Sequence, residues 1–372
     1  MILISILVTV NFVISYRFRT FKVMFTRLPK YLLLSLFLLT GISFAQDTSD
    51  ILFSEPAANS SDPADLMTLR LEIPIKTLRK ETNDSTYTSS TLYFKEQSTW
   101  DSLPVELRTR GEFRRKKCIF PPVKLKFSKK DIENTVFDHN KKLKLVVPCR
   151  HEEAKNDNVV KEYLAYKLYE PVTPYHFKTR LVNLEWSQKA SKKKSGHQLK
   201  AILLEDLDHL AERMGGDAYD RNVHPMRLDT LNGIRNAFFQ YMIGNADYSV
   251  TLGHNYKIIY HEEKFLVIPY DFDLAGLVNA DYGKSSDVQN LRFMGDQPAD
   301  RIYRDFPRNP ALVEQVRQEY LSNREAIFIA LQKTKGFYDN EDEYAEAELY
   351  LTKFYQVLED DKKFNRIINS DK

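Results

Sequence analysis

Acidic residues are absent from the first 45 positions of this 372-residue chain, where five Lys and Arg residues stand alone. The whole chain has a formal charge of +3, but positions 46–372 hold 49 basic and 51 acidic residues and are nearly neutral. This balance excludes a strongly basic nucleic-acid-binding protein. With 43% hydrophobic and 28% charged residues, the sequence is also unlike a disordered chain or a polytopic membrane protein.

Cysteine is scarce, and only Cys118 and Cys149 are present. Two cysteines without a histidine at ligand spacing do not form a zinc site. In an oxidising compartment the two thiols could pair, and each flanks an expected strand. Two unpaired buried thiols are the alternative, and the sequence leaves this choice open.

Sequence signatures of hydrolases are also missing. The chain contains neither Gly-x-Ser-x-Gly nor His-Glu-x-x-His, and neither cysteine has the surroundings of a nucleophile. A glycosidase pair formed by Asp271 and Asp273 is disfavoured, because carboxylates two residues apart rarely span a glycosidic bond.

No apolar run is long enough for an ordinary membrane-spanning helix. The run at 31–45 has 15 residues, is preceded by basic residues and ends in Ser-Phe-Ala, whereas a spanning helix needs roughly 20 residues. We therefore predict a signal peptide over 1–45, cleaved after Ala45, and an exported protein that is periplasmic, on the outer surface or extracellular, with no stable membrane span. A signal peptide that starts at Met24 would have a normal length, so 1–23 reads as a start-site misassignment. If 1–23 belong to the protein, the two short apolar segments could form an uncleaved hairpin.

The rest of the chain divides into three parts. Positions 46–66 are polar and predict a disordered leader. Positions 67–204 predict a β-rich domain, with alternating strands and one long helix that begins at a capping Asn158. Positions 205–372 predict a mainly helical domain with a hairpin at its centre. The expected strands are 69–75, 91–94, 103–110, 122–127, 142–147, 177–186, 199–204, 256–260 and 265–269, and the expected helices are 158–169, 205–214, 231–243, 311–333 and 341–368.

Basic residues concentrate in one part of the β-rich domain. Positions 105–147 hold 13 Lys and Arg against 5 Asp and Glu. A local excess of positive charge attracts anions, so we expect an anionic ligand over this part of the chain.

Carboxylates and an amide gather in a short segment of the second half. Asp247 follows an apolar helix, Asn255 stands at the entry of the hairpin, and Asp271 and Asp273 end its second strand. Phosphoryl transfer uses such a set, with one carboxylate orienting the attacking hydroxyl and others holding Mg²⁺ on the phosphates. The alternative is an acidic turn that caps a strand.

The first half offers partners for such a site. Lys124 lies on an alternating strand and could contact phosphates while pairing with Glu162 of the following helix; a solvent-facing lysine is the alternative. Arg110 precedes Gly111, where the backbone could approach a ligand closely. A tight turn is the alternative there.

Taken together, these segments resemble the CotH (spore coat protein H) kinase family. The likeness lies in Arg110-Gly111, the basic strand 122–127, Asn232-Gly-Ile-Arg-Asn236 before Gly244-Asn-Ala-Asp247, and Asp271-Phe-Asp273. It covers roughly half the chain. It implies an exported, atypical protein-kinase-like protein, and with the order of elements it predicts an α+β, two-lobed fold with a β-rich N-terminal lobe and a mainly helical C-terminal lobe.

The resemblance also implies a role for each matching residue. Asp247 would be the catalytic base toward a Ser or Thr hydroxyl, and Asn255, Asp271 and Asp273 would hold Mg²⁺ or Mn²⁺. The residues expected to bind ATP are Lys124, Glu162, Arg110 and Glu205, the last near the adenine.

Two functions follow from these observations. The first is an exported, Mg²⁺-dependent kinase that transfers phosphate from ATP to a protein in the envelope or outside the cell. The second is a catalytically degenerate kinase-fold protein that acts as a binding or scaffold protein of the cell envelope. The four matching polar residues favour the first function. The lack of a Gly-x-Gly-x-x-Gly loop in the β-rich part favours the second.

Overall fold

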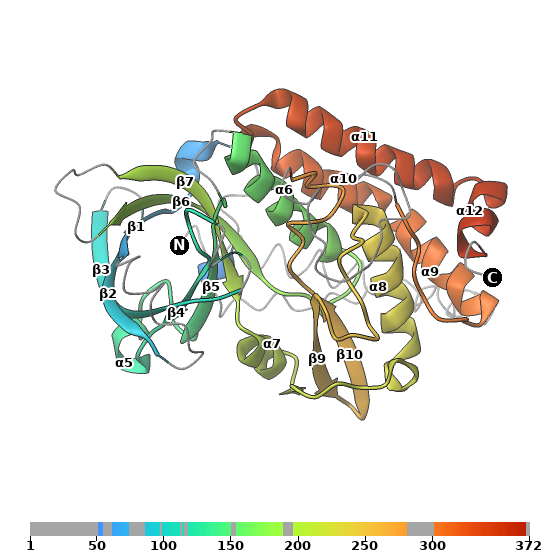
Figure 1. The fold of residues 1–372 in the computed structure, drawn as a ribbon, viewed down its shortest axis with the longest axis horizontal. Helices are drawn as coiled ribbons and strands as arrows, with labels where there is room; N and C mark the ends of the chain where they lie inside the picture. Colours follow the sequence, from blue (N-terminus) through green and yellow to red (C-terminus); the bar gives the residue numbers. More distant parts are fainter. Residues whose placement is uncertain are drawn as a thin grey trace, which may run out of the picture. The chain divides into compact units, whose positions relative to one another are not determined.

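Seven strands of the first half close into a barrel in the computed structural model (Figure 1). The structure describes residues 51–54, 62–73, 86–96, 99–111, 114, 118–149, 154–188, 196–280 and 301–369, so the expected signal peptide lies outside the described residues. Around the barrel the strand order is β1-β2-β3-β4-β5-β7-β6. The strands are β1 (Thr68–Ile73), β2 (Thr88–Glu96), β3 (Thr99–Thr109), β4 (Val123–Lys126), β5 (Lys142–Val146), β6 (Thr179–Gln188) and β7 (His197–Glu205).

The barrel closes through a parallel pairing of its first and sixth strands, in which Leu69 lies beside Leu184. All other neighbouring strands of the barrel are antiparallel. Period-two alternation sends one face of each strand inward. The inward residues, among them Leu71, Leu107 and Leu125, form a buried apolar core, while the charged residues between them face outward.

Helix α6 (Ala154–Tyr169) connects β5 to β6, and the remaining helices follow the barrel in the chain. In Figure 1, α6 lies between the barrel and helices α8–α12. A second sheet has the order β10-β9-β8. Its strands are β8 (Asp217–Ala218), β9 (Tyr256–His261) and β10 (Lys264–Pro269), and the other α-helices are α5 (Lys129–Ile132), α7 (Leu207–Arg213), α8 (Thr230–Ile243), α9 (Pro310–Ser322), α10 (Arg324–Lys333), α11 (Glu341–Leu358) and α12 (Asp361–Ile368).

The expected two-lobed protein-kinase-like fold is wrong. The strands of the first half form a closed seven-stranded barrel rather than the sheet of a separate lobe. The largest apolar core also crosses the expected domain boundary at 204/205, because Leu164 of α6 and Leu204 of β7 pack in one cluster with Phe238 of α8 and Phe354 of α11. Alternating residues reveal which face of a strand is buried but not which strands are neighbours, so the closure was not visible in the sequence.

Most expected strands and helices are confirmed, with different ends. The expected helix 311–333 is interrupted at Asn323 and forms α9 and α10, and the expected helix 341–368 likewise forms α11 and α12. Asn158 is not a cap, because α6 begins four residues earlier. The expectation of a disordered leader over 46–66 is wrong for Ile51–Phe53 and Pro63–Asp65, which form 3₁₀ helices. The buried Leu52 belongs to the barrel core, because its apolar side chain gains more by burial than by hydration.

Cys118 and Cys149 form a disulfide bond, which resolves the choice left open by the sequence. Both residues are buried, and the backbone N–H of Ile119 donates to the carbonyl of Cys149 at 2.8 Å. The bond therefore ties the segment that precedes β4 to the end of β5. Separately, none of the helices in the described residues is both long and apolar enough to cross a membrane.

Removal of the disulfide is expected to lower the free energy of unfolding by about 2–4 kcal/mol, because the bridge restricts the unfolded chain across a separation of 31 residues. The comparison is a urea titration of the wild-type protein and of the double variant Cys118→Ala/Cys149→Ala. A dithiol reductant should destabilise the wild type and leave the double variant unchanged. Equal stability of the oxidised wild type and the double variant would contradict the prediction.

Candidate functional site

Asp247 lies in a loop that begins where helix α8 ends. Gly244 caps this helix with a φ of 64°, a left-handed conformation that favours glycine. The side chain of Asn245 then accepts the backbone N–H of Asp247 at 3.0 Å. The carbonyl of Ala246 accepts a hydrogen bond from Arg304 at 2.8 Å. These contacts fix the position from which the Asp247 carboxylate extends.

Asn255 binds Asp247 directly. Its Nδ2 donates to the carbonyl of Asp247 at 2.8 Å and to carboxylate Oδ2 at 2.9 Å. His254 Nε2 lies 3.4 Å from the same oxygen, and this hydrogen bond raises the pKa of His254. Because the amide nitrogen of Asn255 faces Asp247, its Oδ1 is the atom that could serve as a metal ligand.

Asp271 is held next to this pair by its backbone. The N–H of Tyr270 donates to the carbonyl of Asn255 at 3.2 Å, and the N–H of Asp271 donates to the hydroxyl of Tyr166 at 3.0 Å. Asp271 has a φ of 66°, which turns the chain sharply after β10. The structure therefore places Asp271 one residue beyond a backbone contact with Asn255, whose side chain binds Asp247.

Asp273 and Glu162 form a second, buried acidic group. Asp273 Oδ2 lies 3.6 Å from Nε of Arg114. Glu162 is almost fully buried, and its Oε1 has no hydrogen-bond partner among the described residues. Burial and, to a lesser extent, the carboxylates of Asp273 and Asp271 together raise the pKa of Glu162 to about 8, although Arg114 opposes this shift. This environment favours either a bound proton or a bound cation.

Lys124 does not make the contact expected of it. Its Nζ lies 3.0 Å from Oδ2 of Asp206, so the predicted pairing with Glu162 is wrong. Lys124 faces outward on β4, and its charge is neutralised by the residue that precedes α7.

Lys144 is the site residue that the sequence analysis missed. It lies next to Lys124 in the barrel register, and its Nζ lies 5.1 Å from the ring centroids of both Phe177 and Tyr270. Burial and, to a lesser extent, the charge of Arg110 together lower the pKa of Lys144 to about 7, although Asp206 opposes this shift. A signal was present in the sequence: Val146, on the same face of the strand, is apolar, which indicates that this face becomes covered.

The cations beside Lys144 form a row across three strands. Arg108 of β3 lies opposite Lys124 of β4, which lies opposite Lys144 of β5, and Arg110 follows Arg108 on the same face. Within the part of the chain that the structure describes, the Nε atoms of both arginines are buried without a hydrogen-bond partner. Among the described residues, Arg108, Arg110 and Lys144 have no ion pair with a carboxylate. We call Arg108, Arg110 and Lys144 the cationic row; Lys124 lies among them but is excluded because Asp206 neutralises its charge.

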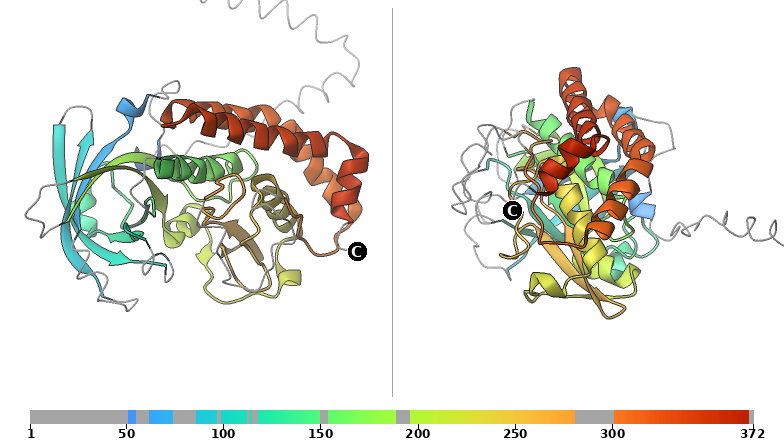
Figure 2. Two further views of the ribbon diagram at one scale, coloured as in Figure 1. Left: turned by 45° about the horizontal axis from the view of Figure 1, so that its top comes forward. Right: turned by 90° about the vertical axis from the view of Figure 1, so that its right-hand side faces the viewer.

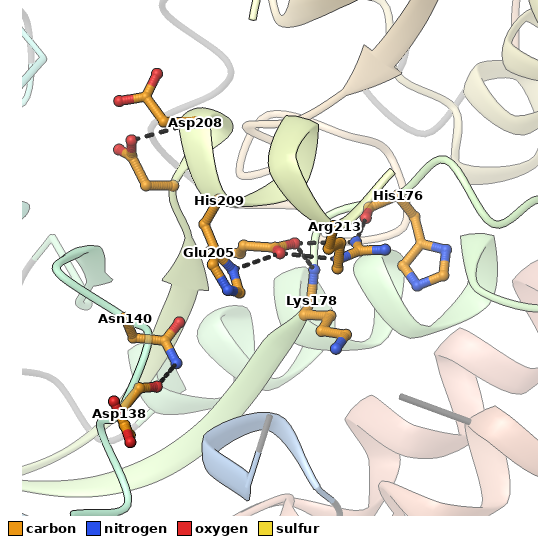
Figure 3. A network of polar contacts seen from close by, with 9 residues as sticks. Asp138, Asn140, His176, Lys178, Glu205, Asp208, His209 and Arg213 are labelled. Atoms are coloured by element: carbon orange, nitrogen blue, oxygen red, sulfur yellow. Dashed lines mark hydrogen bonds and ion pairs between the residues drawn. The ribbon is translucent and has the colours of Figure 1, made fainter. Parts of the chain in front are cut away.

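Both carboxylate oxygens of Glu205 already accept hydrogen bonds from neighbouring groups, so neither is available to an adenine (Figure 3). Its carboxylate binds His209 Nδ1 at 2.9 Å, Arg213 Nε at 2.9 Å and the backbone N–H of Lys178 at 2.8 Å. The side chain is fully buried, and despite this burial the hydrogen bonds from His209 and Arg213 lower the pKa of Glu205. The contacts tie α7 to the strand that precedes it, so the expected role of Glu205 near the adenine is wrong.

Comparison with known proteins does not assign this chain to a family. No protein-family model matches the chain, and no curated protein matches it. Its function must therefore be argued from the site itself.

Proposed function

We propose that this protein transfers the terminal phosphoryl group of ATP to a Ser or Thr hydroxyl of another protein, with Mg²⁺ or Mn²⁺ as cofactor. The proposal rests mainly on one observation: Lys144 and Arg110 of the cationic row lie close to the carboxylate site, where Lys144 faces Tyr270 and the charge of Arg110 acts on Glu162. Lys144 and Asp271 are linked through Tyr270, whose ring lies under the lysine and whose chain continues into the aspartate. A triphosphate carries several negative charges, which three unpaired cations would neutralise.

The oxygen atoms at the site suit a magnesium ion held together with phosphates. Such ions use one or two protein carboxylates and complete their coordination with phosphate oxygens and water. The described residues contain no cluster of three or more His, Cys, Asp or Glu side chains arranged around a metal, and this mode of binding does not require one. Asp271 and Oδ1 of Asn255 would hold the ion, with Asp273 nearby. The ion would neutralise charge on the transferred group.

Phosphate binding, proton acceptance and orientation of the catalytic carboxylate are assigned to different residues of the protein. The cationic row would bind and orient the phosphates. Asp247 would accept the proton of the attacking hydroxyl, because it lies beside Asn255 and keeps a carboxylate oxygen near the ion site. His254 and Asn255 hold the carboxylate in one orientation. The residues that carry the resemblance to the CotH kinase family support the same reaction, although the fold expected from that resemblance is not the one observed.

The proposal includes export and a protein substrate outside the cytoplasm. A disulfide bond is typical of oxidising compartments, and the Cys118–Cys149 bond therefore supports the exported location predicted from the N-terminal sequence.

The test is phosphate incorporation from labelled ATP with the purified protein, in the presence and absence of Mg²⁺. We expect metal-dependent transfer, and we expect Asp271→Asn to abolish the metal-dependent rise in melting temperature caused by ATP. Asp220→Asn is a matched control, because Asp220 is exposed and lies in the loop before α8. Nucleotide binding without transfer would favour a binding protein of the cell envelope, and no nucleotide binding would refute the proposal.

A further inference from the structure

Charged side chains from distant parts of the chain meet along one side of helix α6. They come from α6, from β7 and from the segment that leads into α11. Figure 2 shows the beginning of α11, in red, beside the green α6. We call this group the α6–α11 junction, and its members are Asp157, Lys161, Lys200, Asp339, Asn340 and Glu343.

Asp157 anchors the chain that leads into α11. Its two carboxylate oxygens accept the backbone N–H of Asp339 at 2.7 Å and that of Asn340 at 3.0 Å. Asp157 is fully buried. A buried carboxylate needs its hydrogen-bond donors, so the start of α11 cannot move away from α6 without a large loss of free energy.

Two ion pairs strengthen this attachment. Lys161 of α6 pairs with Glu343, and Lys200 of β7 pairs with Asp339. The lysine side chains are only 3% and 8% exposed, whereas those of Glu343 and Asp339 are 25% and 42% exposed. Each lysine is therefore buried and forms an ion pair with an acidic residue that reaches solvent, and removal of either partner leaves a charge without this counterion.

The next residues of α6 point to the candidate site. Asp157 and Lys161 are four residues apart and therefore share one side of the helix. Glu162 and Tyr166 have the same spacing and share another side. Tyr166 accepts the backbone N–H of Asp271 at 3.0 Å and packs on Phe272 with ring centroids 4.6 Å apart. One rigid helix thus contacts the junction and the site.

We propose that the α6–α11 junction positions α6, and through Tyr166 fixes the backbone of the segment Asp271–Asp273. Lys161 and Glu343 are positioning residues in this scheme, since neither touches the site. The consequence for phosphate transfer rests on the proposed function, whereas the effect on the backbone of Asp271 does not. The C-terminal helices therefore control the geometry of the site from the other side of α6.

The test compares Lys161→Met and Glu343→Gln with the control Glu346→Gln, which alters an exposed residue one turn further along α11. The first readout is amide hydrogen exchange at Asp271, which reports the bond to Tyr166. We expect exchange about 3- to 30-fold faster in Lys161→Met and in Glu343→Gln, because each breaks the ion pair, and no change in the control. The second readout is phosphate transfer, where we expect kcat to fall and KM for the acceptor to stay constant.

The outcomes separate this inference from the proposed function. Faster exchange at Asp271 without phosphate transfer in any form of the protein would support the positioning role and refute the phosphotransferase. Transfer by the wild type with unchanged exchange in both variants would overturn the positioning role. If Lys161→Met does not fold, Glu343→Gln decides, because the partly exposed glutamate is replaced by an amide of the same shape.

Discussion

Replacement of Lys144 by methionine is expected to stabilise the protein while removing its activity. The amine is more than nine-tenths buried, faces two aromatic rings and has cations as its nearest charged neighbours apart from Asp206. Methionine fills a similar volume without a charge. At pH 6 the free energy of unfolding should rise by up to about 5 kcal/mol, since the pKa of Lys144 is lowered from 10.5 to about 7 and each unit of this shift corresponds to about 1.4 kcal/mol.

The gain should depend on pH in a defined direction. Burial lowers the pKa of Lys144 from 10.5 to about 7 in the folded protein. Between these values the unfolded chain binds more protons than the folded protein, so the stability of the wild type rises with pH. Below about pH 7 the amine is charged in both states and the cost of burying it is fully present. The advantage of Lys144→Met should therefore be largest near pH 6 and should shrink toward pH 10.

The measurement is urea unfolding of Lys144→Met and wild type at pH 6 and pH 9, together with ATP binding. Lys141→Met is the matched control, because Lys141 is exposed three residues earlier and should show neither the gain nor its pH dependence. ATP affinity of Lys144→Met should fall at least about tenfold, as expected when a charge-assisted contact to phosphate is lost. A destabilised variant at pH 6 would show that Lys144 is paired in solution.

The second large effect is expected from Asp247→Asn. The substitution removes the proton acceptor but keeps an oxygen that can accept the hydrogen bond from Asn255 Nδ2. Phosphate transfer should therefore fall by about 10²- to 10⁴-fold, the usual contribution of a positioned general base. ATP binding and the melting temperature should remain near the wild-type values, because the cationic row and the loop contacts are unaltered.

Single-turnover transfer with preformed protein–ATP complex measures this effect separately from binding. Asp220→Asn provides the same change of charge at an exposed position and should transfer phosphate at the wild-type rate. Transfer by Asp247→Asn within tenfold of the wild type would show that another group accepts the proton.

The acidic part of the site could be predicted from the sequence because its residues are close in the chain. Asp247 and Asn255 are eight residues apart, and the hairpin of β9 and β10 returns the chain so that Tyr270 bonds Asn255. A hairpin register is a local property, so spacing alone was informative. Glycine and asparagine residues beside Asp247 and Asn255 also indicated turns at these positions.

The basic part could not be assigned from the sequence in the same way. Lys124 and Lys144 both occur on alternating strands, and they lie side by side in the barrel. Only the packing of Tyr270 and Phe177 against β5, and of Asp206 against β4, distinguishes the buried amine from the neutralised one. These contacts join residues that are 33, 126 and 82 positions apart, and period-two alternation does not encode contacts over such separations.

Closure of the barrel also determines the order in which the chain can fold. Strand β1 needs β6 beside it, and the bonded side chains of Arg70 and Glu185 are 115 residues apart. A chain that emerges from its N-terminus therefore presents β1 with an unsatisfied edge until β6 and β7 have followed. Contacts of such long range form late and slowly. Until then the inner faces of the first five strands are open to other chains, so the last barrel strands protect the nascent protein from aggregation.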